Sequence, residues 1–219
     1  MRVAIVLNTS WNIFNFRLGL IKALIERGYE VHTIAPRDEY SSKLIDLGCV
    51  YHEIKMDSRG ANPIKDSALI IELWNIYRHV NPDVILHYTI KPNIYGSLAA
   101  SLLRIPVINN VCGLGTSFLN ENLVSKIALK LYKLAFRTPK LVYFQNTDDL
   151  NFFVGNNLIS KDQTDLLPGS GINLEKFKPL KPAQNKKFSF LLVSRLIHDK
   201  GIFEYINAIK ILKAKGIDA

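Results

Sequence analysis

Two cations flank a turn near the end of the sequence. The segment Ser194–Gly201 reads SRLIHDKG and joins a predicted strand to a predicted helix. Arg195 and Lys200 stand on either side of this turn, close to the N-terminus of the expected helix. Unpaired backbone amides, the positive end of the helix dipole and two charged donors together suit a diphosphate group. We therefore predict that this turn binds the diphosphate of a ligand.

Further polar residues follow the strands predicted in the first half of the chain. Asn12 lies in the loop Asn8–Asn12, which suits either sugar hydroxyls or a turn that caps the next helix. This loop has no glycine, which argues against a dinucleotide pyrophosphate. Lys91 and Asn93 stand where a strand meets a helix, which suits either an anion or simple helix capping.

Glycine-bearing turns occur at two other strand ends. Arg59 lies in one of them and suits either a phosphate clamp or a solvated loop position. Gly113 and Gly115 lie in the other, where missing side chains allow a ligand to approach the backbone. Cys112 beside them has no adjacent base, so we interpret it as a small packing residue.

Short apolar runs alternate with helical patterns from residue 2 to residue 156. The expected strands are Arg2–Leu7, Glu30–Ala35, Val50–Ile54, Val84–Tyr88, Val107–Val111 and Leu141–Gln145. The expected helices are Phe16–Arg27, Ser41–Leu47, Asp66–His79, Asn93–Leu103, Leu123–Arg137 and Thr147–Asn156. Strands joined by helices pair in parallel, and strands that are apolar throughout are covered on both faces. The sequence predicts a Rossmann-like, doubly wound parallel α/β sheet, which binds ligands beyond the carboxyl ends of its strands.

The chain is expected to contain one whole domain and part of another. Residues 1–168 form the predicted sheet domain, and the polar, proline-bearing stretch 169–187 is interpreted as a linker. Residues 188–219 contain an expected strand, Phe188–Val193, and an expected helix, Ile202–Lys215. One strand and one helix cannot bury their apolar faces alone. We interpret them as the first βα unit of a truncated second domain.

Composition narrows the class of protein. The 219 residues are 48% hydrophobic and 21% charged, which is typical of a folded globular chain. Two cysteines exclude a disulfide framework and favour a reducing cytoplasm. We expect no metal site, because the histidines and cysteines are scattered, and no membrane span, because long apolar runs are missing.

The net charge of +9 suits an anionic partner. Nucleic acid is not expected, because no nucleic-acid-binding motif is present. Lys126, Lys130, Lys133 and Arg137 recur at spacings of four, three and four, on one face of a predicted helix. Such a face suits either an anionic membrane surface or ordinary contact with water.

Four segments resemble known proteins. Leu191–Leu212 looks like the opening of the C-terminal domain in retaining glycosyltransferases of the GT-B fold, and Leu166–Pro179 resembles their interdomain segment. His87–Ala100 and Asn110–Phe118 resemble a narrower bacterial branch. That branch transfers sugars onto undecaprenyl-diphosphate-linked glycans and includes N-acetylgalactosaminyltransferases that act on a bacillosamine lipid.

The resemblance implies a two-substrate enzyme. Arg195 and Lys200 match the family residues that bind the diphosphate of a UDP-sugar donor, so no metal and no cofactor would be required. The N-terminal domain would bind a polyprenyl-diphosphate-linked glycan during surface polysaccharide or glycan assembly. The candidate acceptor-binding residues are Asn12, Arg59, Lys91, Asn93, Gly113 and Gly115. The transferred sugar would be a hexose or an N-acetylhexosamine, and the enzyme would be peripheral on the inner face of the cytoplasmic membrane.

This chain departs from the family pattern in two respects. Many relatives have a histidine after the fifth strand, where this sequence has Asn109, Asn110 and Cys112, so no catalytic residue is assigned. The family's glutamate-containing donor motif would lie beyond residue 219, so we expect an inactive N-terminal fragment. The alternative is a non-catalytic domain that binds sugar or lipid diphosphates.

Overall fold

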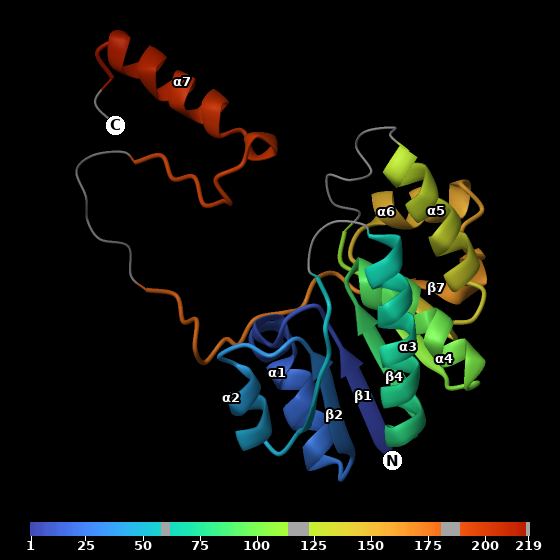
Figure 1. Ribbon diagram of the computed structural model, residues 1–219. Coiled ribbons are helices and arrows are strands. Elements are labelled where there is room, and N and C mark those ends of the chain that lie inside the picture. The colour runs from blue at the N-terminus through green and yellow to red at the C-terminus, as the bar shows by residue number, and fades with distance from the viewer. Residues whose placement is uncertain (58–61, 114–122, 181–188, 218–219) are drawn as a thin grey trace. The chain divides into compact units, whose positions relative to one another are not determined.

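The computed structural model describes residues 1–57, 62–113, 123–180 and 189–217, without the side chains of residues 123 and 124. The chain divides into two compact units, Met1–Asn173 and Leu174–Ala219 (Figure 1). The division falls inside the stretch that the sequence suggested as a linker. Each unit is described by itself.

The first unit is built on a parallel sheet with the order β3-β2-β1-β4-β5-β6-β7. Its strands are β1 (Arg2–Val6), β2 (Glu30–Ala35), β3 (Val50–Glu53), β4 (Val84–Tyr88), β5 (Val107–Val111), β6 (Leu141–Phe144) and β7 (Thr164–Leu166). Val3 of β1 lies opposite Val31 of β2 on one side and Val84 of β4 on the other. The predicted doubly wound parallel sheet is confirmed. Its strand order reverses between β1 and β4, which is where such sheets open a crevice for ligands.

β7 was not predicted from the sequence. Thr164 and Asp165 are polar, and Asp165 and Leu166 are exposed, so the segment produces no apolar run. The strand forms because its backbone pairs with the edge of β6, where Thr164 lies opposite Val142. The first compact unit extends to Asn173, whereas the domain predicted from the sequence ended at residue 168.

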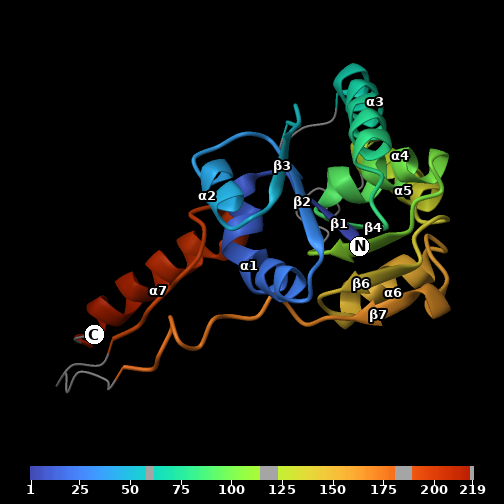
Figure 2. The ribbon, with the colours of Figure 1, turned by 90° about the horizontal axis from the view of Figure 1, so that it is seen from below.

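Helices cover both faces of the sheet (Figures 1 and 2). They are α1 (Ser10–Glu26), α2 (Ser41–Asp46), α3 (Pro63–Val80), α4 (Ser97–Leu102), α5 (Leu123–Ala135) and α6 (Thr147–Gly155), and a π-helical turn, Pro92–Gly96, precedes α4. α1 begins six residues before the predicted start at Phe16, because the Thr9 side chain caps it by accepting from the Asn12 amide. α5 ends at Ala135, so Arg137 lies beyond the helix.

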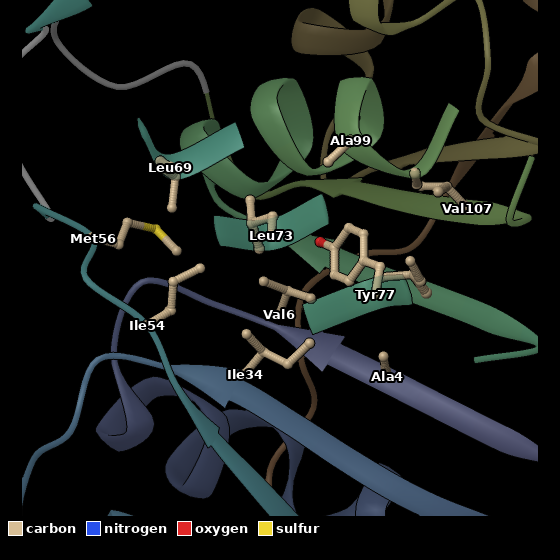
Figure 3. Close-up of a cluster of buried hydrophobic side chains, with 12 residues drawn as sticks. Ala4, Val6, Ile34, Ile54, Met56, Leu69, Leu73, Tyr77, Ala99 and Val107 are labelled. Atoms are coloured by element: carbon tan, nitrogen blue, oxygen red, sulfur yellow. The ribbon is translucent and has the colours of Figure 1, made fainter. Parts of the chain in front are cut away.

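Alternating side chains of the sheet pack into separate clusters. Ala4 and Val6 of β1 face α3 and α4, in the cluster shown in Figure 3. Ile5 and Leu7 point to the opposite face and pack with residues of α1 and α2. Successive residues of a strand point to opposite faces, so the strands of a sheet that is covered on both faces are mainly apolar. α5 and α6 bury an aromatic group with β6 in a third cluster: Tyr132, Phe136, Phe144 and Phe153.

The second unit contains a 3-10 turn, His198–Lys200, followed by α7 (Ile202–Ala214). The expected strand Phe188–Val193 is wrong for residues 189–193, which form no strand, and Phe188 lies outside the described residues. Leu191 and Val193 are 85% and 83% exposed. A strand needs a neighbour for its backbone hydrogen bonds, and the described part of this unit supplies none.

Candidate functional site

A cavity of about 210 Å³ opens at the carboxyl ends of β4 and β5, beside the point where the strand order reverses. It is lined by Thr89, Ile90, Asn93, Val111, Cys112, Gly113 and Tyr132. Two predicted acceptor-binding residues, Asn93 and Gly113, therefore share its wall. Cys112 was expected to be a packing residue, but it is exposed and faces the cavity.

Thr89 has a strained backbone. Its φ of 66° is left-handed, which is unfavourable for a β-branched side chain. Its carbonyl accepts from the Asn93 amide at 3.1 Å, so the strained residue forms the turn that leads from β4 into the π-helical segment. The Thr89 hydroxyl is buried and makes no hydrogen bond within the described part of the chain. Strain of this kind persists where the surrounding structure imposes it, and such residues gather at ligand sites.

Asn93 offers a second polar atom to the cavity. Its side chain is 1% exposed, and Nδ2 donates to the Asn110 carbonyl at 3.0 Å. Its Oδ1 accepts no hydrogen bond from the residues that the structure describes. A buried carbonyl oxygen without a donor is costly, so this atom suits a ligand hydroxyl or amide.

Arg17 was missed by the sequence analysis. It lies on the buried face of α1 with Ile13 and Ile21, and only 8% of it is exposed. Its guanidinium lies 4.0 Å from the centre of the Tyr88 ring, and its Nη2 is 3.9 Å from Sγ of Cys112 in the cavity wall. The sequence pattern that could have revealed it is an arginine with an isoleucine four residues before it and another four residues after it, on the apolar face of the helix.

A group of buried, hydrogen-bonded polar side chains is centred on His87 of β4, the strand that leads to the cavity. Nε2 of His87 lies 2.8 Å from Oη of Tyr77, and its Nδ1 lies 3.0 Å from Oδ1 of Asn109. Burial lowers the pKa of His87 to about 3, so the ring is neutral at ordinary pH. A Cβ on Gly96 would lie 2.5 Å from the same ring, so a larger residue does not fit there. This histidine supports the architecture and does not face a ligand.

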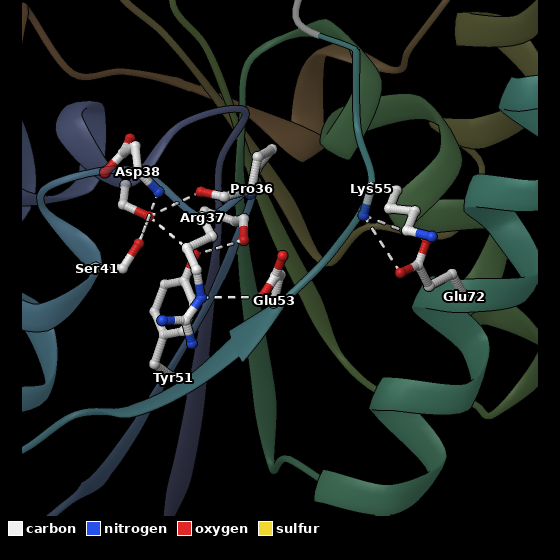
Figure 4. Close-up of polar contacts among 10 residues, drawn as sticks. Pro36, Arg37, Asp38, Ser41, Tyr51, Glu53, Lys55 and Glu72 are labelled. Atoms are coloured by element: carbon white, nitrogen blue, oxygen red, sulfur yellow. Dashed lines mark hydrogen bonds and ion pairs between the residues drawn. The ribbon is translucent and has the colours of Figure 1, made fainter.

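A second cavity, of about 570 Å³, lies between α3 and the carboxyl ends of β2 and β3. Most of its charged lining residues have partners: Arg37 binds Glu53 at 2.9 Å, and the Glu72 carboxylate accepts from the Lys55 backbone amide (Figure 4). Lys91 lines this cavity and not the first one, and its Nζ lies 2.7 Å from Oδ1 of Asp66. The ammonium that the sequence suggested for an anion is thus already neutralised by a carboxylate.

The remaining predicted residues lie elsewhere in the first unit, in the second unit, or outside the described residues. Asn12 lies in the first turn of α1, where its Nδ2 donates to Oδ1 of Asn8 at 3.1 Å, and it lines neither cavity. Arg59 and Gly115 lie outside the described residues. Arg195 and Lys200 are exposed in the second unit, and Lys200 lies in the turn that precedes α7. Among the described residues, no cluster of three His, Cys, Asp or Glu side chains could hold a metal ion.

Residues 2–146 match the sequence family described as Glycosyl transferase 4-like. The chain belongs to this family. It is also 30% identical over 232 residues to a Campylobacter jejuni protein, the N,N'-diacetylbacillosaminyl-diphospho-undecaprenol alpha-1,3-N-acetylgalactosaminyltransferase. That alignment covers 98% of this chain and 61% of the relative, so the chain spans about three fifths of the relative's length. The family resemblance inferred from the sequence motifs is confirmed.

Solved structures agree on the fold. A glycosyltransferase from Rickettsia africae has a TM-score of 0.60 at 14% identity, and the match covers 100% of this chain and 50% of that one. Anabaena HepE, in complex with UDP and glucose, has a TM-score of 0.57 at 14% identity, over 80% of this chain and 46% of that one. At such low identity these likenesses establish the architecture alone.

Proposed function

We propose that this chain belongs to a glycosyltransferase that moves a hexose or an N-acetylhexosamine from a UDP-sugar to a polyprenyl-diphosphate-linked glycan. The observation that carries the proposal is the 30% identity, over almost the whole chain, to a relative named for an undecaprenol diphosphate substrate. The cavity at the ends of β4 and β5 is consistent with it, because its buried polar atoms suit a polar, hydroxyl-bearing ligand.

The two units would divide the substrates. The cavity that contains Asn93 and Gly113 would receive part of the acceptor, and Arg195 and Lys200 would bind the donor diphosphate. Both cations are exposed and near the start of α7, so they can approach an anion without opening a packed core. Negative charge grows on the leaving UDP as the glycosidic bond breaks, so these donors would stabilise the transition state without a metal. Retention at the anomeric carbon is part of the proposal.

Peripheral association with the inner face of the membrane would follow from a lipid-linked acceptor. Lys126, Lys130 and Lys133 of α5 and Arg137 beyond it are all exposed. Ile127 and Leu134 are 50% and 49% exposed on the same helix, so basic and apolar groups reach the surface together. Each basic residue near an anionic membrane contributes about 1 kcal/mol. Within the described residues, no helix is long and apolar enough to cross a bilayer.

The membrane proposal is tested by flotation of the chain with vesicles. Binding to anionic vesicles should exceed binding to neutral ones and should fall in a variant with Lys126, Lys130 and Lys133 changed to Gln. Equal binding to both vesicle types would contradict an electrostatic attachment.

The enzymatic proposal is tested with the full-length protein, a panel of UDP-sugars and polyprenyl-diphosphate-linked acceptors. One donor–acceptor pair should give a transferred sugar, whereas the 219-residue chain alone should give none. Arg195→Ala and Lys200→Ala should each lower turnover about 100-fold, because loss of one transition-state donor has roughly that effect. Binding of both substrates without turnover would favour the non-catalytic alternative.

A further inference from the structure

Buried polar atoms without partners gather at one place in the first unit. Within the described residues, four buried side-chain atoms make no hydrogen bond: Nε of Arg17, Oγ1 of Thr33, Oγ1 of Thr89 and Oδ1 of Asn93. Three of them lie near the carboxyl ends of β4 and β5, beside the strand-order reversal. Thr89 and Asn93 line the cavity there, and Arg17 contacts Tyr88 and Cys112 next to it. Buried polar groups in folded proteins nearly always have partners, so we expect a ligand to bind these three atoms.

Arg17 carries a buried positive charge whose hydrogen-bond partners among the described residues are all neutral. Nη1 donates to the Phe16 carbonyl at 3.0 Å and to Oγ of Ser170 at 2.7 Å. No carboxylate of a described residue forms an ion pair with the guanidinium. A buried charge without a counterion is costly, and an anionic ligand would remove that cost.

The guanidinium is held with one edge available. Nη1 is occupied by its two oxygen partners, which fixes the orientation of the group. Nε has no described partner, and Nη2 contacts the Cys112 sulfur at 3.9 Å, which is a weak acceptor. Nε and Nη2 form the side-on pair of donors with which arginine binds two oxygens of one phosphate. This edge is turned toward Cys112, which itself lines the cavity.

We propose that Arg17, Thr89 and Asn93 form a recessed subsite for a glycosyl diphosphate, with a phosphate on Arg17 and the adjoining sugar in the cavity. The Thr89 hydroxyl would donate to a phosphate oxygen, and Oδ1 of Asn93 would accept from a sugar hydroxyl or amide. The cavity is smaller than pockets that hold whole drug-sized ligands, which suits a single sugar ring. The inference deepens the proposed function and rests on it, because both the donor and the lipid acceptor of that reaction carry a diphosphate.

The test measures binding to the 219-residue chain by calorimetry, without any turnover. The probes are UDP-N-acetylglucosamine, geranyl diphosphate and inorganic pyrophosphate. Arg17→Met should weaken binding of a diphosphate probe at least 10-fold. Loss confined to the UDP-sugar would assign the subsite to the donor, and loss confined to geranyl diphosphate would assign it to the acceptor lipid.

A matched control is Arg78→Met. The Arg78 guanidinium also lies over an aromatic ring, 5.3 Å from the centre of the Trp74 ring, but it is exposed on α3. This variant should bind every probe as the wild type does. The subsite is refuted if no probe binds the wild type at millimolar concentration, or if Arg17→Met binds all probes with unchanged affinity.

Two further variants separate ligand binding from a purely structural role of Arg17. If Arg17→Met does not fold by circular dichroism, Asn93→Asp puts a negative charge into the cavity proposed to hold the glycosyl diphosphate and should weaken binding about 10-fold. Arg17→Lys keeps the charge but lacks the side-on pair, so its affinity should lie between wild type and Arg17→Met. Wild-type affinity in a folded Asn93→Asp variant would overturn the proposal.

The subsite and the proposed function fail in different ways. Arg17-dependent binding, with no sugar transfer by the full-length protein, would leave the subsite in place and remove the enzymatic proposal. Sugar transfer with unchanged kcat and KM in full-length Arg17→Met would support the enzymatic proposal and refute the subsite.

Discussion

Two buried cations near the carboxyl ends of β4 and its neighbours differ in what surrounds them. The Lys91 side chain is 14% exposed and is paired with the Asp66 carboxylate, which also accepts from Oη of Tyr95 at 3.0 Å. Arg17 is similarly buried, but its described partners are a carbonyl, a hydroxyl and a thiol. A cation with its own carboxylate belongs to the architecture of the fold. Because the described partners of Arg17 are all neutral, its charge is available to an anionic ligand.

The two cavities differ in the same way as the two cations, in whether acidic residues accompany the basic ones. Among the described residues, the one beside α3 is lined by four basic and four acidic side chains: Arg37, Lys55, Lys65, Lys91, Glu53, Asp57, Asp66 and Glu72. The described lining of the smaller one, at β4 and β5, contains no acidic residue, and this cavity adjoins Arg17 through Cys112. The described lining of the larger cavity thus has as many basic as acidic residues, whereas that of the smaller one favours an anion.

The largest effect should come from Asp66→Asn, which removes the carboxylate that pairs with Lys91. It leaves the Lys91 ammonium buried without a counterion, and we expect a loss of about 3–5 kcal/mol in the free energy of unfolding in urea. The exposed pair between Asp57 and Lys65 supplies the control, because Asp57→Asn should change stability far less. Similar losses in both variants would show that burial does not distinguish the pairs.

A second effect concerns His87, a buried side chain whose two ring nitrogens both have hydrogen-bond partners while the ring is neutral. Its pKa is lowered to about 3 from an ordinary value of 6.5, so the unfolded chain binds a proton that the folded chain excludes. Its contribution to stability is complete above pH 6.5 and is lost as the pH falls toward 3, by up to about 1.4 kcal/mol per pH unit.

The measurement for His87 is urea unfolding from pH 7 to pH 4.5, in wild type and in His87→Gln. The variant is the necessary comparison, because burial also lowers the pKa values of His32 and His52. A shallower pH dependence in His87→Gln is expected. An unchanged slope would mean that His87 is not the group that excludes the proton.

A smaller effect is expected for Thr89→Gly. Glycine relieves the left-handed strain, and the lost hydroxyl has no described partner, so stability should rise by about 1 kcal/mol. Binding of diphosphate probes should weaken at the same time, which would show that the strained conformation of Thr89 supports ligand binding. Asn81→Gly is the control, since asparagine tolerates its φ of 48° at the end of α3. Reduced stability in Thr89→Gly would contradict this reading.

The smallest effect on stability should be that of Arg17→Met. No carboxylate of the described residues loses its partner, and replacing a buried charge by an apolar side chain of similar length is often neutral. The free energy of unfolding should therefore change by less than about 1 kcal/mol. A loss as large as that of Asp66→Asn would make Arg17 a structural cation and would remove the contrast with Lys91.

Most of the sheet was predictable, because its buried parallel strands are mainly apolar runs that must be covered on both faces. Polar residues inside them, such as His87 and Asn109, are hydrogen-bonded to each other. β7 escaped because it is held by backbone pairing with β6, and its side chains carry no apolar pattern. The opposite error occurred at residues 189–193, where an apolar run has no neighbouring strand in the described part of its unit. Pairing, and not composition, decided both cases.

The sequence by itself determined the parallel sheet, the family and the presence of Asn93 and Gly113 at strand ends that form the cavity. It could not determine which cation is compensated. Lys91 meets Asp66 across 25 residues of sequence, and Arg17 meets Cys112 and Ser170 across 95 and 153. The state of a buried charge depends on the groups within a few ångströms of it. Those groups come from distant segments, so only tertiary packing could show that Lys91 is neutralised and that Arg17 has no carboxylate partner among the described residues.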